Sequence, residues 1–375
     1  MLSCFSRALA PAFLCVSLLS LPAQSQPVQA RPVVEVAFVL DTTGSMASLI
    51  EGAKRKIWSI ATSIVDANPD AEIRMGLVAY RDIGDEYVTK RFELTTDIQD
   101  LYANLLELKA RGGGDWPESV NEALHEAVAK MSWSNGAANC RIVFLVGDAP
   151  PHMDYAQDMK YPQVLAVARQ KDILVNAVQA GGARDTERVW REIAQMGGGK
   201  YIPIPQDGGK IVVIETPYDI EIIELQRELN GTVIPYGPRP QRSSVEQKTR
   251  QAASAPSPVA SEMASYLNKR AKTASAVEAV TGGGDLVADV AAGRQKLASL
   301  KEDDLPDSFR GMSAAEREAA LGKQMSQRKA LNERMSELVR KRDLFVAEKR
   351  KSEPVKAGDS FDRVVEETLR AQIKR

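Results

Sequence analysis

Five oxygen-bearing side chains stand at the ends of apolar runs or in a glycine-rich loop of this sequence: Asp41, Thr43, Ser45, Asp115 and Asp148. Oxygen ligands, with neither His nor Cys among them, suit a hard cation rather than zinc or copper. Mg²⁺ is the expected ion, with Ca²⁺ or Mn²⁺ as alternatives. Neutral hydroxyls beside carboxylates leave such an ion able to accept a further carboxylate from a partner.

Each of these residues also has a simpler interpretation that the sequence leaves open. Ser45 could cap a helix that begins at Met46. Asp115 and Glu118 form an Asp-x-x-Glu pattern, which is typical of a helix N-terminus. Asp148 could belong to a turn, because two prolines follow it closely. Turn and capping chemistry explain each residue alone, but not their arrangement at the ends of separate elements.

The elements that would position these residues alternate along the chain. Apolar runs predict six strands, at 33–40, 73–80, 87–94, 141–147, 173–179 and 200–204. Helical patterns separate them, at 46–67, 97–110, 117–132, 160–171 and 184–196. This alternation predicts an α/β fold, a doubly wound, mostly parallel six-stranded sheet flanked by helices. The run at 87–94 alternates polar and apolar residues, which predicts an antiparallel edge strand.

Ligands of open α/β sheets bind beyond the carboxyl ends of the strands. Asp41 and Asp148 each follow a predicted strand, and Asp115 precedes a predicted helix. The three carboxylates are therefore expected to meet at one edge of the sheet.

These residues resemble the metal-ion-dependent adhesion site (MIDAS) of a von Willebrand factor A (vWA) domain. The resemblance rests on DTTGSM after the first strand, the glycine-rich RGGGDWPES loop and the strand-end GDAPPH, and AYRD resembles the bacterial and hemicentin-like branch. It covers about residues 33–205. It implies that Asp41, Thr43, Ser45 and Asp148 bind the ion, with Asp115 where the family has a Thr. A third carboxylate should bind the cation more tightly and weaken its demand for a partner's carboxylate.

Other reactive groups give weaker signals. His152 is close enough to Asp148 to reach the rim of the site, and Asp82 lies nearby in this fold. The chain has two histidines and no cysteine cluster, so a zinc site is not expected. The sequence lacks both a Gly-x-Ser-x-Gly elbow and a phosphate-binding loop. An enzyme, for example a hydrolase, is therefore not expected.

The first thirty residues have the pattern of a secretory signal peptide, with Arg7, an apolar run at Phe13–Leu21 and small residues up to Ala30. An uncleaved anchor is the alternative. Cleavage would leave Cys140 as the one cysteine, so no internal disulfide could form. This pattern predicts a periplasmic or secreted protein with no stable membrane span after cleavage.

The remaining chain divides into a vWA domain at 31–231, a Pro/Ser/Ala-rich linker at 232–260 and a charged helical region at 261–375. Residues Arg31–Pro240 contain 22 Lys and Arg against 30 Asp and Glu, whereas Gln241–Arg375 contain 26 against 20. The basic region could therefore dock on the acidic domain, or remain a solvated helix. Its longest amphipathic segment, Ser313–Lys349, predicts a long helix, with a coiled coil as the weaker interpretation.

The sequence thus predicts an exported vWA protein that holds a divalent cation and mediates protein interaction or assembly in the cell envelope. The expected partner is a protein that offers an acidic residue, and nothing indicates nucleic acid. The alternative is a structural scaffold whose metal site is vestigial or only stabilises the fold. The sequence leaves the oligomeric state open.

Overall fold

The computed structural model describes residues 32–136, 140–209, 214–271, 281, 283–352 and 360–373. The predicted signal peptide at 1–30 lies outside these residues. Within the described part of the chain, no helix combines the length and the apolar character needed to cross a membrane.

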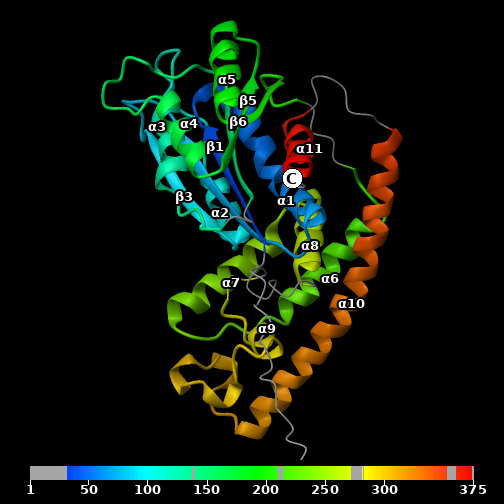
Figure 1. The fold of residues 1–375 in the computed structure, drawn as a ribbon. Coiled ribbons are helices and arrows are strands. Elements are labelled where there is room, and N and C mark those ends of the chain that lie inside the picture. Colours follow the sequence, from blue (N-terminus) through cyan, green and yellow to red (C-terminus); the bar gives the residue numbers. More distant parts are fainter. Residues whose placement is uncertain are drawn as a thin grey trace, which may run out of the picture. The chain divides into compact units, whose positions relative to one another are not determined.

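A six-stranded sheet forms the centre of the fold (Figure 1). Its strands are β1 (Val33–Asp41), β2 (Glu72–Tyr80), β3 (Thr89–Thr95), β4 (Cys140–Gly147), β5 (Ile173–Ala180) and β6 (Gly198–Ile204). They lie in the order β3-β2-β1-β4-β5-β6, and every neighbouring pair is parallel except β2 and β3. The predicted mostly parallel α/β fold and its antiparallel edge strand are both confirmed.

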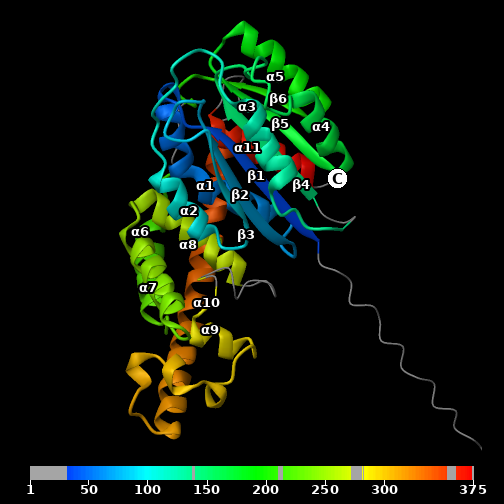
Figure 2. The ribbon, with the colours of Figure 1, turned by 90° about the vertical axis from the view of Figure 1, so that its left-hand side faces the viewer.

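Both faces of the sheet are buried, which explains the nearly continuous apolar runs. In β1, Val34, Val36 and Leu40 belong to one apolar cluster, whereas Ala37 and Val39 belong to a second cluster on the opposite face. The helices of the first layer are α1 (Ala47–Ala67) and α2 (Ile98–Glu107). The second layer contains α3 (Val120–His125), which continues as a π-helical turn (Glu126–Lys130), α4 (Tyr161–Gln170) and α5 (Arg184–Met196). Figure 2 shows the sheet between these layers.

Helices from the C-terminal third complete the first layer. The helices after the sheet are α6 (Asp219–Gly231), α7 (Arg239–Ser254), α8 (Ser257–Ala271), α9 (Leu286–Ala291), α10 (Ala314–Ser352) and α11 (Phe361–Ile373). Both α8 and α11 pack against α1. Phe361, Val365 and Leu369 of α11 are buried in the same apolar cluster as the sheet. Gln372 of α11 also exchanges hydrogen bonds of 2.8 and 3.0 Å with Asn176 of β5.

In the structure, α7 and the start of α8 occupy most of the predicted linker at 232–260. Pro238 and Pro240 stand at the start of α7, and Pro256 and Pro258 at the start of α8, where proline is tolerated. Val245 is buried, and the buried Lys248 pairs with Asp97 at the start of α2. The packing also differs from the predicted domain limit at 231, since α6 contacts α8 and α10.

The long predicted helix at Ser313–Lys349 is confirmed as α10. Leu331, Met335 and Leu338 form an apolar stripe on this helix and are buried against α6 and α8. Arg328 of the same helix forms an ion pair with the buried Asp285 at the start of α9. The apolar stripe of α10 therefore contacts helices of its own chain. The sequence left two alternatives open for the region at 261–375, and the contacts of α8 and α11 with α1 agree with docking rather than with a solvated helix.

Candidate metal centre

The carboxyl end of β1 gathers the three predicted residues of the first loop. Asp41 is the last residue of β1 and is fully buried. Its Oδ1 accepts hydrogen bonds from the backbone N–H and the hydroxyl of Thr43, at 2.8 and 2.7 Å. The hydroxyl oxygens of Thr43 and Ser45 lie 3.3 Å apart. Ser45 makes no side-chain cap at the start of α1, so the loop presents these oxygens together rather than capping a helix.

The carboxyl end of β4 contributes Asp148, which is buried beside Asp41. A Cβ on Gly147 would lie 3.1 Å from Oδ2 of Asp41 and 2.4 Å from the hydroxyl of Tyr80. The glycine therefore lets the two strand ends approach each other. Oδ2 of Asp148 accepts a hydrogen bond of 2.6 Å from Gln206, which follows β6.

The glycine-rich loop brings Glu118 to this site, where the sequence had predicted Asp115. A Cβ on Gly113 would lie 3.2 Å from both Glu118 Oε1 and Thr43 Cβ, so these two side chains flank the same glycine. Gly112 and Gly113 have φ of 78° and 84°, a region that favours glycine. The Gly112 carbonyl accepts a hydrogen bond of 3.2 Å from the Gly44 N–H, which joins this loop to the first.

Asp115 lies instead beside His152, at 3.5 Å, and its side chain is 60% exposed. Glu118 was missed because the sequence pattern placed it inside the first turn of a helix. In the structure α3 begins only at Val120, with Ser119 as its N-cap, so Glu118 precedes the helix.

Two carboxyl groups of this edge, those of Asp41 and Glu118, have strongly raised pKa values. Burial, followed by the nearby Asp148 and Asp85 charges, raises the pKa of Asp41 to about 7, although hydrogen bonds from Thr43 oppose the shift. Burial and the charges of Asp41 and its acidic neighbours raise the pKa of Glu118 to about 9. Each raised pKa reflects the free-energy cost of ionising a buried carboxyl group close to other negative charges.

The unpartnered oxygens of the site fit a bound cation. Asp41 Oδ2 and Glu118 Oε2 are buried, and neither has a hydrogen-bond partner. Buried polar atoms almost always have a hydrogen-bond partner, so such a pair indicates a bound ion or water. Carboxylate and hydroxyl oxygens are the ligands of Mg²⁺, Ca²⁺ and Mn²⁺. The donor set of Asp41, Thr43, Ser45, Glu118 and Asp148 therefore suits a hard divalent ion.

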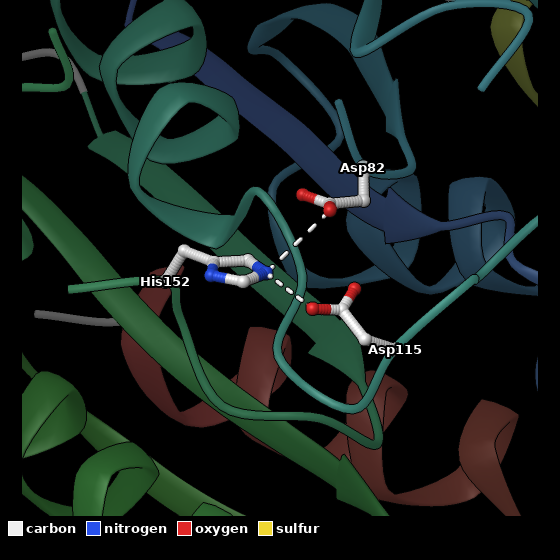
Figure 3. Close-up of side chains that lie close together, drawn as sticks. All are labelled: Asp82, Asp115 and His152. Atoms are coloured by element: carbon white, nitrogen blue, oxygen red, sulfur yellow. Dashed lines mark ion pairs between the residues drawn. The ribbon is translucent and has the colours of Figure 1, made fainter. Parts of the chain in front are cut away.

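A second group of side chains lies next to this edge (Figure 3). Asp82, which follows β2, is buried and accepts hydrogen bonds from Ser119 and Tyr155 at 2.8 and 2.7 Å. His152, in the loop after β4, faces both Asp82 and Asp115 at 3.5 Å. The sequence had placed Asp82 and His152 near the site, but gave no reason to group them with Asp115.

Comparison with known proteins agrees with this fold. A family model described as von Willebrand factor A domain matches residues 35–206. A putative ariadne-like RING finger protein of Acanthamoeba polyphaga mimivirus is 31% identical over 122 residues, which are 32% of this chain and 12% of that protein. The alpha-protein kinase vwkA of Dictyostelium discoideum is 27% identical over 128 residues, 33% of this chain and 20% of the kinase. This chain therefore matches only a small part of either relative.

Solved structures with a similar domain include an aerotolerance-related membrane protein of Bacteroides fragilis, with a TM-score of 0.32, 16% identity, and coverage of 47% of this chain and 92% of that one. The pilus adhesin SpaC of Lactobacillus rhamnosus GG has a TM-score of 0.37 and 16% identity, over 48% of this chain and 29% of the adhesin. The sheet order, the loops at its carboxyl edge and the family match lead to one conclusion. Residues 35–206 of this chain form a von Willebrand factor A domain.

Proposed function

We propose that the vWA domain binds a divalent cation, Mg²⁺ in preference to Ca²⁺ or Mn²⁺, through Asp41, Thr43, Ser45, Glu118 and Asp148. The observation that carries this proposal is the pair of buried, unpartnered oxygens on Asp41 and Glu118 at the carboxyl edge of the sheet. Two positive charges at this edge would offset the burial and the repulsion that raise the pKa of both groups.

The ion would serve as a contact for a protein partner that offers an acidic side chain. Ser45 is exposed, as is the neighbouring glycine loop at 111–116, so this edge is open to a partner. We further propose that the chain is exported by its N-terminal signal and acts in the cell envelope as a binding or assembly protein without enzymatic turnover.

A purely stabilising metal is the second candidate, and one observation favours it. Three of the proposed ligands, Asp41, Glu118 and Asp148, are carboxylates, where the family resemblance implied two with a neutral hydroxyl. Three negative charges exceed the charge of a divalent ion, so the complex would attract a partner's carboxylate less strongly. In this case Mg²⁺ would stabilise the fold without recruiting a partner.

The test compares the full chain with Asp41→Asn and with Asp70→Asn as the matched control. Asp70 is exposed in the turn between α1 and β2, at the opposite edge of the sheet from Asp41. The proposal expects Mg²⁺ to raise the thermal stability of the wild type and the control, and EDTA to reverse the effect. Asp41→Asn should show no response. If the wild type does not respond to Mg²⁺, the metal proposal is wrong.

Partner capture separates the two candidates. Cross-linking in the cell envelope, followed by purification with Mg²⁺ or EDTA, should recover the same partner with the wild type and Asp70→Asn only when Mg²⁺ is present. Replacing the partner's acidic residue should abolish the capture. Stabilisation by Mg²⁺ without any metal-dependent partner would support the scaffold. Mass spectrometry of the N-terminus of the exported protein tests the predicted cleavage.

A further inference from the structure

The side chains of Asp82, Asp115 and His152, here called the His152 cluster, come together from three separate loops (Figure 3). One potential ligand atom from each lies within 4.8 Å of the other two. His152 Nε2 is 3.5 Å from Asp82 Oδ2 and 3.5 Å from Asp115 Oδ2. An acidic pair alone would not define a site, but the orientation of the imidazole adds an independent constraint.

The imidazole of His152 is fixed with its Nε2 toward the two aspartates. Its Nδ1 lies 2.9 Å from Asp154 Oδ1, and an ionised carboxylate can only accept, so Nδ1 carries the hydrogen. This bond lowers the pKa of Asp154. The ring also stacks on Tyr155, with 4.0 Å between ring centroids and 10° between planes. In the neutral imidazole, Nε2 then presents a lone pair to two carboxylates.

With a neutral His152, the His152 cluster contains two carboxylates and no positive charge. The His152 side chain is 7% exposed, and Nε2 is buried with no hydrogen-bond partner. A separation of 3.5 Å is longer than the 2.7–3.2 Å typical of N–H···O hydrogen bonds. Two ligands of a tetrahedral zinc ion, each roughly 2.1 Å from the metal, are about 3.4 Å apart. Both nitrogen-to-oxygen distances therefore match two ligands of one zinc ion better than a direct hydrogen bond.

The surroundings of the cluster resemble those of known metal ligands. A metal-bound imidazole usually donates its other N–H to a carboxylate, as His152 does to Asp154. Metal-binding carboxylates are themselves hydrogen-bonded, and Asp82 accepts bonds from Ser119 at 2.8 Å and Tyr155 at 2.7 Å. Side chains outside the cluster therefore hold two of its members in place. Asp154 orients His152, and Ser119 and Tyr155 orient Asp82.

We infer that Asp82, Asp115 and His152 bind a divalent transition metal ion of the Zn²⁺ class, at a second site distinct from that of Asp41 and Asp148. The imidazole nitrogen selects such an ion over Mg²⁺ or Ca²⁺. Three protein ligands leave a fourth position open, and the exposure of Asp115 places that position toward solvent. A zinc site was not expected from the sequence, because the chain has two histidines and no cysteine cluster. The site inferred here needs only one histidine.

The second ion would join the loops that carry the first site. The backbone of Glu118 donates to the Pro150 carbonyl at 2.9 Å and accepts from the His152 N–H at 3.1 Å. These hydrogen bonds join the glycine-rich loop to the loop after β4. An ion bound by Asp115 and His152 would join the same two loops at a second point. This inference goes beyond the proposed function, because it requires neither Mg²⁺ nor a partner.

The two histidines make the test direct, because the imidazole signals of His125 and His152 are the only ones in the chain. The full chain, purified without a polyhistidine tag and with ¹⁵N-labelled histidine, is titrated with ZnCl₂ in excess Mg²⁺. One imidazole is expected to shift at one equivalent of Zn²⁺. That signal should be missing in His152→Gln and should shift unchanged in the matched control His125→Gln.

Two further variants distinguish this site from the first. Asp115→Asn changes an exposed side chain and should fold normally, yet should bind Zn²⁺ at least about tenfold more weakly. Asp41→Asn should still bind Zn²⁺ at His152, even if it no longer responds to Mg²⁺. The inference is overturned if Zn²⁺ leaves the His152 signal unchanged, because a protonated His152 would then bridge the aspartates. It is equally overturned if Asp115→Asn binds Zn²⁺ as tightly as the wild type.

Discussion

The buried carboxyl of Asp41 should make the metal-free protein lose stability as the pH rises. Its pKa is raised from 3.8 to about 7 in the folded chain, so the native state holds a proton that the unfolded state has already released. Because the carboxyl pKa is raised by folding, the loss of stability is absent below the pKa of the unfolded state and complete above the pKa of the folded state. Stability therefore falls between about pH 4 and pH 7.

The size of this loss follows from the shift. Each pKa unit corresponds to about 1.4 kcal/mol, so the raised pKa of Asp41 costs about 4 kcal/mol above pH 7. Between pH 5 and pH 8 the free energy of unfolding should fall by about 3 kcal/mol on account of this group. Asp41→Asn keeps the shape without the charge, so this part of the pH dependence should disappear.

Urea unfolding followed by tryptophan fluorescence, in EDTA at pH 5 and pH 8, measures the difference. Buried Trp58 and Trp190 lie in α1 and α5, on opposite faces of the sheet, and report on both layers. Asp70→Asn should retain the full loss. Adding Mg²⁺ at about 100 times its dissociation constant should return about 3 kcal/mol to the wild type at pH 8. The reasoning is refuted if metal-free Asp41→Asn loses as much stability between pH 5 and pH 8 as the wild type.

Three other substitutions test the surrounding structure. Gly147→Ser would place a Cβ 2.4 Å from the Tyr80 hydroxyl, and we expect weaker Mg²⁺ binding by calorimetry, whereas Gly182→Ser meets nothing within 4 Å and should bind normally. Leu369→Ala in α11 removes a fully buried side chain and should lower the free energy of unfolding by about 3 kcal/mol in urea. Arg328→Met leaves a buried carboxylate at the start of α9 unpaired, and a loss of about 3 kcal/mol or more is expected by the same measurement.

Matched controls and contrary outcomes are available for each. Leu344→Ala changes a leucine that is 61% exposed, and Arg334→Met breaks an exposed ion pair with Glu221, so both should leave stability nearly unchanged. Equal effects of Leu369→Ala and Leu344→Ala would show that α11 does not support the core. Normal Mg²⁺ binding by Gly147→Ser would argue against the close approach of the two strand ends.

Most of the sheet could be predicted because its signal is local. A strand buried on both faces must be apolar at almost every position, and the runs at 33–40 and 141–147 satisfy this requirement. Asp41 and Asp148 could be predicted for the same reason, since polar residues that directly follow such runs lie at the carboxyl edge of the sheet. The structure differs from the predicted limits of these strands by only one residue at one end.

The missed features depend on information that no short window contains. Glu118 looked like part of a helix because its spacing from Asp115 matches a capping pattern, and only the true start of α3 shows otherwise. The grouping of Asp82 with His152 joins loops 70 residues apart. The role of α11 was equally hidden, because an amphipathic helix does not indicate which surface it will cover.

The packing of α11 on the sheet has a consequence for how this chain matures. The contact between Asn176 and Gln372 spans 196 residues, so one face of the vWA domain is incomplete until residues 361–373 have been synthesised. Closing so large a loop slows folding, and the uncovered apolar face is prone to aggregate meanwhile. A chain that stalls or is cut before α11 would therefore expose this face to chaperones and proteases. The same helix that fills the core therefore makes the folding of the vWA domain depend on residues far beyond 206 in the sequence.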